Sequence, residues 1–106
     1  MANSIDETLD DNYIGYNGLI IAVVKQAAKE YKKAYIRLSN DLSIENYGFF
    51  ITERLFFINN CNGYIGVDLA NYIYNKLNDE LEEKVGKKKY KKTNKYIELM
   101  DSKSNN

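Results

Sequence analysis

Histidine is absent from this chain of 106 residues, and there is a single cysteine, Cys61. One cysteine excludes a disulfide within the chain, and the shortage of both residue types argues against a zinc site of the usual Cys/His kind. A free thiol is typical of a reducing compartment. A cysteine nucleophile also needs a base, and no histidine can act as one. We therefore expect a protein that has no cofactors and is not an enzyme.

Long apolar runs are also missing. The longest unbroken run, Leu19–Val24, is too short to span a bilayer. The N-terminus lacks the basic start and apolar core of a signal peptide. We expect a soluble, cytoplasmic protein with no membrane partner.

The formal net charge is zero, but the charges are distributed in blocks. The net charge is −4 over residues 1–17, +3 over 18–42, −5 over 43–83 and +6 over 84–106. Blocks of like charge are often only solvated, but they also mark surfaces that attract oppositely charged partners. We interpret residues 1–17 as an acidic N-terminal arm and residues 86–106 as a lysine-rich C-terminal extension.

Between these ends lies a strongly periodic segment, residues 20–38. Apolar residues recur there with the three- and four-residue spacing of one helix face, at Ile20, Val23, Val24, Ala27, Tyr31, Ala34, Tyr35 and Leu38. This spacing predicts a first helix over 18–38. Asp41 or Ser43 can cap the helix that follows by accepting a backbone N–H bond.

The second predicted helix, residues 44–59, is apolar around most of its circumference. One stripe is widened by four phenylalanines, and its members are Ile44, Tyr47, Ile51, Leu55 and Ile58. Such a helix tends to lie in the middle of a structure, so we expect it between two others. Strands over 47–52 and 54–58 are the alternative, although no period-two alternation supports them. A loop is expected at 59–63.

A third helix is predicted over 69–85. Its apolar stripe is Leu69, Ile73, Leu77 and Leu81. Asp68 can cap this helix and Gly86 can end it. Beyond it, a short helix over 95–100 and a frayed end are both compatible with the sequence. The expected fold is all-α, a compact bundle of three main helices with short terminal helical or disordered extensions, in which residues 18–85 form the helical domain.

Two groups of cations are candidate partner-binding residues. The first is a basic stripe on the first helix, formed by Lys25, Lys29, Lys32, Lys33 and Arg37. The second is a cluster in the C-terminal extension, formed by Lys87, Lys88, Lys89 and Tyr90 and continued by Lys91, Lys92 and Lys95. Cations on a helix can follow a phosphate backbone, and a basic segment with an aromatic residue can bind single-stranded nucleic acid or an acidic protein. The alternative for both groups is a solvated surface.

Tyrosine is the third candidate, because ten tyrosines exceed what a small core needs. Tyrosine gives rigid contact area with a polar tip and is enriched at interfaces. We select Tyr64 and Tyr74 as partner-binding candidates. Tyr72 and Tyr74 project to different sides of one helix, so at least one of them should face away from the core. The alternative is that most tyrosines complete the core.

Several of these positions also carry a resemblance. They are Val24, Lys25, Gln26 and Ala27, then Tyr31, Ala34 and Leu38, then Phe49, Phe50 and Glu53, and finally Tyr72, Ile73 and Leu77. In this pattern the chain resembles a group of short proteins from phages and integrated mobile elements of low-GC Gram-positive bacteria. The resemblance implies a compact helical accessory protein acting in the cytoplasm of a bacterial host, and it implies no particular activity.

Together these observations favour a non-catalytic binding protein that engages a host protein or nucleoprotein complex. An inhibitor of a bacterial defence system, such as an anti-CRISPR protein, fits the size and the charge blocks. The alternative is a small nucleic-acid-binding regulator that uses the basic stripe and the lysine cluster. A homodimer is a further expectation, because the second helix has more apolar surface than a three-helix monomer easily hides.

Overall fold

The computed structural model describes residues 18–104, so the predicted acidic arm, residues 1–17, lies outside the described residues. Over 18–104 the chain forms helices and no strand: α2 (Gly18–Asn40), α3 (Ile44–Ile65), α4 (Val67–Val85) and α5 (Lys87–Ser104). The all-α prediction is confirmed, and the strand alternative is wrong. The count of three main helices needs correction, because the C-terminal extension forms a fourth helix of 18 residues.

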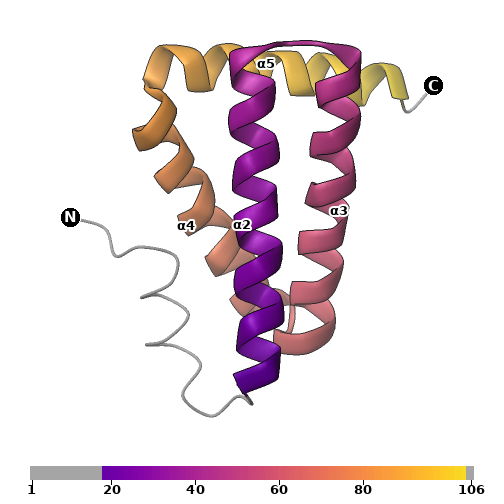
Figure 1. Cartoon of the computed structure of the whole chain (residues 1–106), viewed down its shortest axis with the longest axis vertical. Helices are drawn as coiled ribbons and strands as arrows, with labels where there is room; N and C mark the ends of the chain where they lie inside the picture. Colours follow the sequence, from indigo (N-terminus) through magenta and orange to yellow (C-terminus); the bar gives the residue numbers. More distant parts are fainter. Residues whose placement is uncertain (1–17, 105–106) are drawn as a thin grey trace.

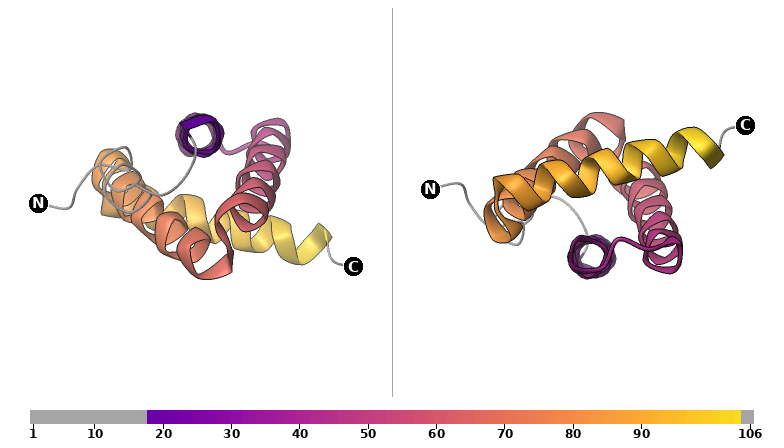
Figure 2. Two further views of the ribbon diagram at one scale, coloured as in Figure 1. Left: turned by 90° about the horizontal axis from the view of Figure 1, so that it is seen from below. Right: turned by 90° about the horizontal axis from the view of Figure 1, so that it is seen from above.

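Figure 1 shows α2 and α3 side by side in opposite directions, with α4 inclined on the other side of α2. α5 lies across one end of the other helices, and Figure 2 shows it from above, running from the end of α4 towards the upper end of α3. α2 contacts each of the other three helices. α3 packs on both α2 and α4, as the prediction that the second helix lies between the other two requires, and α2 and α4 also contact each other.

The inner face of α2, which contacts the other three helices, combines small and aromatic residues. Ala27, Ala28 and Ala34 are buried and allow the neighbouring helices to approach closely. Tyr31 and Tyr35 are also buried and fill the space between those helices. Small side chains thus permit a close approach of the helices, and two large rings fill the space between them.

Tyr31 is the centre of an aromatic cluster. Its ring centroid lies 5.5 Å from that of Phe50 and 5.6 Å from that of Phe57, both on α3. Its hydroxyl donates a hydrogen bond of 3.0 Å to Asn78 Oδ1 on α4, so burial leaves no unpaired polar group there. The same burial raises the pKa of Tyr31, and the hydroxyl stays neutral. The cluster therefore connects three helices without an internal charge.

α3 is longer than predicted, because the segment expected to form a loop at 59–63 is helical and the helix ends at Ile65. Cys61 and Ile65 are buried and continue the inner stripe of Phe50 and Phe57. Burial of these side chains outweighs the weak helix propensity of the asparagines and the glycine between them.

Two of the three predicted helix ends are confirmed, the start of α3 and the end of α4. The Ser43 hydroxyl accepts a hydrogen bond from the backbone N–H of Asn46 at 3.2 Å and caps α3. Gly86 ends α4 with a φ of 92°, and its N–H donates to the carbonyl of Glu82 at 2.9 Å. The predicted Asp68 cap is wrong, because the turn into α4 is made by Gly66 with a φ of 87°, a conformation that glycine adopts without steric strain.

α5 is attached to α2 by a polar contact, and it buries only a small apolar surface. The Tyr35 hydroxyl donates a hydrogen bond of 2.8 Å to Asn94 Oδ1. Thr93 and Ile97 are the buried residues of α5. Few apolar side chains of α5 are buried, which is why the hydrophobic pattern did not predict its full length.

The C-terminal half of α5 is attached to α3 through Asp101. Its carboxylate accepts hydrogen bonds of 3.0 and 3.1 Å from the Arg54 guanidinium and another from the Tyr47 hydroxyl. Burial alone would raise the pKa of Asp101, but the hydrogen bonds from Arg54 and Tyr47 and the charge of Arg54 outweigh it and hold that pKa below its ordinary value. The folded chain therefore keeps Asp101 ionised.

We expect Asp101→Asn to lower the free energy of unfolding by about 1–3 kcal/mol near neutral pH, since it removes the negative charge from these hydrogen bonds. Because the pKa of Asp101 is lowered on folding, the carboxylate contributes stability above its unfolded pKa, and the contribution is lost as pH falls through the folded pKa. The difference between wild type and variant should therefore shrink from about pH 7 to about pH 3 in urea unfolding followed by circular dichroism.

Glu98→Gln is the control, because Glu98 is an exposed acid on the same helix. It should change stability little at either pH. An Asp101→Asn difference that stays equally large at the lower pH would contradict the role given to Asp101.

Candidate functional site

Six lysines cover the exposed side of the first half of α5. We call this surface the lysine face, and its members are Lys87, Lys88, Lys89, Lys91, Lys92 and Lys95. None of them forms an ion pair with any residue of 18–104. Lys89 donates a hydrogen bond to the side-chain oxygen of Asn40 at the end of α2. The lysine face is therefore a concentrated positive surface held on a folded helix, and not a flexible tail.

The position of these lysines in α5 is electrostatically unfavourable. The first turn of α5 holds Lys87, Lys88 and Lys89 and no acid. The start of a helix carries partial positive charge and favours acids, so cations there lower helix stability. The same positive end adds to the field of the lysine face and makes it more attractive to an anion.

Tyr90, predicted with this cluster, is half-buried and faces α2. Its ring centroid lies 5.8 Å from that of Tyr35. Its carbonyl oxygen is 3.4 Å from the Tyr35 hydroxyl. Tyr90 therefore helps to hold α5 on α2, and the lysines around it present the surface.

The basic stripe of α2 is less concentrated than its sequence implies. Lys32 pairs with Glu80 of α4 at 3.4 Å, and Lys33 lies 3.9 Å from Glu30. The Arg37 guanidinium lies over the Phe49 ring of α3, 4.6 Å from its centroid. Lys25 is partly buried, and Lys29 is exposed. The structure thus directs several of these cations towards neighbouring side chains of the chain itself.

The two predicted tyrosines have different surroundings. Tyr64 is 47% exposed near the end of α3. Tyr74 is half-buried, with its ring stacked on Phe57 at 6.3 Å and its hydroxyl 3.4 Å from that of Tyr31. Tyr72 is exposed, so the prediction that one of Tyr72 and Tyr74 faces away from the core is confirmed.

The outer side of α3 carries exposed apolar residues and few charges. Five of the large apolar side chains that remain exposed lie on this helix: Ile44, Phe49, Leu55, Phe56 and Tyr64. The periodicity of the sequence already showed an apolar surface in excess of what the core needs. It did not show that the excess stays uncovered by the rest of the chain.

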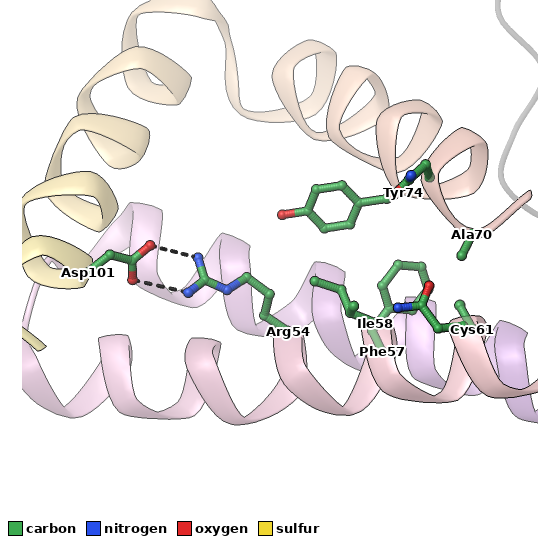
Figure 3. A pocket seen from close by; sticks show the side chains of 9 residues that line it. Arg54, Phe57, Ile58, Cys61, Ala70, Tyr74 and Asp101 are labelled. Carbon is green, nitrogen blue, oxygen red and sulfur yellow. Dashed lines mark hydrogen bonds and ion pairs between the residues drawn. The ribbon is translucent and has the colours of Figure 1, made fainter. Parts of the chain in front are cut away.

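A cavity of about 300 Å³ lies between α3, α4 and α5. Figure 3 shows Arg54 extending from α3 to Asp101 of α5, and Tyr74 projecting from α4 over the same hollow. The floor is apolar and includes Phe57 and Cys61. The charged groups at its edge are already paired with each other, so the cavity offers no free charge to a ligand.

Cys61 lies in the floor of this cavity. Burial raises the pKa of Cys61 to about 12, so its thiol stays protonated near neutral pH and is a weak nucleophile. Over residues 18–104, no group of three or more Cys, Asp or Glu side chains is placed to hold a metal ion. No helix in the same range is long and apolar enough to cross a membrane.

Comparison with protein-family models, with curated proteins and with solved structures finds no match to this chain. The lysine face is therefore selected as the candidate site on its geometry and charge alone.

We expect Lys88→Glu to raise the free energy of unfolding by about 0.5–1 kcal/mol, because the new carboxylate lies at the positive end of α5 and four residues before Lys92. Thermal unfolding followed by circular dichroism measures the change. Lys103→Glu is the matched control, since Lys103 lies in the last turn of the same helix. There the substitution should destabilise by a few tenths of a kcal/mol. The same sign for both variants would contradict the argument.

Proposed function

We propose that this chain is a non-catalytic binding protein of a phage or mobile element that engages a host protein or nucleoprotein complex through the lysine face of α5. The observation that carries the proposal is the lysine face itself: six exposed lysines at the start of one helix, without an ion pair to any residue of 18–104. An anionic partner would supply the compensating charge that this part of the chain does not provide.

The phage or mobile-element context rests on the resemblance over residues 20–80. The more specific form of the proposal is an inhibitor of a bacterial defence system, such as an anti-CRISPR protein. A nucleoprotein defence complex has anionic surfaces, because nucleic acid is part of it. A small basic helical domain can bind such a surface and block access to it. Catalysis is not required, because occupation of a binding surface is sufficient to inhibit.

Affinity capture from a lysate of a low-GC Gram-positive bacterium, identified by mass spectrometry, tests this proposal. Lys88→Glu/Lys91→Glu should reduce recovery of the partner at least about tenfold, because both positions reverse sign within the surface that faces the partner. A defence complex among the captured proteins is what the inhibitor form requires.

Lys29→Glu/Lys33→Glu on α2 is the matched control, since it makes the same change in net charge at two exposed lysines. It should retain the partner. Loss with the α2 variant and retention with the α5 variant would move the site to the basic stripe and reject the lysine face.

The second candidate is a small nucleic-acid-binding regulator, and the density of the lysine face favours it. If the lysine face follows a single strand, the affinity should fall steeply with salt, with a slope of log affinity against log salt of about −4 for six contacts. Fluorescence anisotropy with a labelled oligothymidylate measures this slope. No complex at low salt would remove this candidate.

A further inference from the structure

A groove lies beside the lysine face, further along α5. Its volume is about 570 Å³, larger than the cavity between α3, α4 and α5. Leu42, from the connection between α2 and α3, meets Tyr96 and Leu99 of α5 there, and Leu99 is 54% exposed. The rest of the lining is Lys92, Lys95, Glu98 and Ser102. The groove thus has apolar walls and shares two lysines with the lysine face.

The lysines and the groove follow one another along the same side of the helix. Lys88, Lys92, Lys95, Leu99 and Ser102 are spaced four, three, four and three residues apart, which is the spacing of one helix face. The surface is therefore cationic at the start of α5 and apolar towards its end. Glu98 is the single acid among the lining residues, against the two lysines.

We infer that this surface binds an acidic polypeptide segment of a partner protein, with its carboxylates on the lysine face and an aliphatic or aromatic anchor in the groove. The inference rests on the proposed function and names the partner of the same surface. Charge complementarity fixes the sign of the segment. The walls of the groove favour an apolar side chain over a nucleic-acid strand, whose bases would need rings to stack on, because Leu42 and Leu99 are aliphatic and Tyr96 is the one aromatic residue among the lining residues. An amphipathic helix about as long as α5, about 27 Å, would cover both parts.

The apolar residues of the acidic arm that lie nearest to α2 are too close to it to supply the anchor. Its apolar residues Tyr13, Ile14 and Tyr16 lie within five residues of Gly18, a span of about 17 Å when fully extended. α2 has 23 residues, so Gly18 and Leu42 are separated by a helix of about 34 Å. These three residues therefore cannot reach the groove of the same molecule.

Two fluorescein-labelled synthetic peptides test the inference by fluorescence anisotropy on the full chain. Both are rich in Asp and Glu and have equal charge, and one carries Leu and Phe at helical spacing where the other carries Ser. We expect the apolar peptide to bind about tenfold more tightly than the Ser peptide. Leu99→Asn should remove that difference. Leu55→Asn is the matched control, because Leu55 is 53% exposed and lines a different hollow, so it should keep the difference.

The outcomes separate this inference from the proposed function. Equal binding of both peptides, unchanged by Leu99→Asn but lost with Lys88→Glu/Lys91→Glu, would overturn the groove and leave the lysine face as a binding surface. Binding of an oligothymidylate without binding of either peptide would overturn the inference that the partner is an acidic polypeptide segment, and it would favour a nucleic-acid partner. Tighter binding of the apolar peptide by an arm-acid variant, with Asp6, Glu7, Asp10 and Asp11 replaced by Asn or Gln, would support the inference and show that the acidic arm competes for the surface. Absence of binding to the peptides and to the oligothymidylate alike would overturn both the acidic-segment inference and the nucleic-acid-binding candidate.

Discussion

The polar attachment of α5 to α2 and α3 is the constraint on which the candidate surface depends. Tyr35 of α2 forms a hydrogen bond with Asn94 of α5. Two turns further along α5, Asp101 accepts hydrogen bonds from Arg54 and Tyr47 of α3. Two fixed points set the rotation of a helix as well as its position. Together with Ile97 and the partly buried Tyr90 and Met100, which pack against the core, these hydrogen bonds keep the lysines outward and direct the groove residues towards the connection between α2 and α3.

The electrostatics at the junction of α4 and α5 oppose the stability of each helix taken alone. α4 ends with Asp79, Glu80, Glu82 and Glu83, although the end of a helix favours cations, and α5 begins with lysines, although the start favours acids. The turn at Gly86 brings these opposite charges close enough to offset each other in part. The lysine face makes no ion pair over residues 18–104, so part of the unfavourable electrostatic free energy at the start of α5 remains. An anionic partner would reduce it.

Hydrophobic periodicity was enough to predict α2 and α4, because both bury one regular stripe. It predicted too short a helix for α3, since Cys61 and Ile65 are separated from the main stripe by residues of weak helix propensity and are helical only because the bundle buries them. It missed the extent of α5, because Asn94 and Asp101 look like surface residues until their partners on α2 and α3 are known. The lysines were visible in the sequence, but the sequence did not show which cations would be paired: the contact of Lys32 with Glu80 exists only once α4 is packed on α2.

The distribution of charge also decides where a second copy of this chain would fit, and homodimerisation remains a prediction. Two lysine faces repel each other, so a symmetric contact through the first half of α5 is disfavoured. The outer side of α3 has no such obstacle, because its exposed residues include Ile44, Leu55 and Phe56 and its acids are only Glu45 and Glu53. The area of a face about 33 Å long and one helix wide is small beside the ~800 Å² that a standard interface buries on each partner. Self-association through α3 alone would therefore be weak, and it would leave α5 free to bind a different partner.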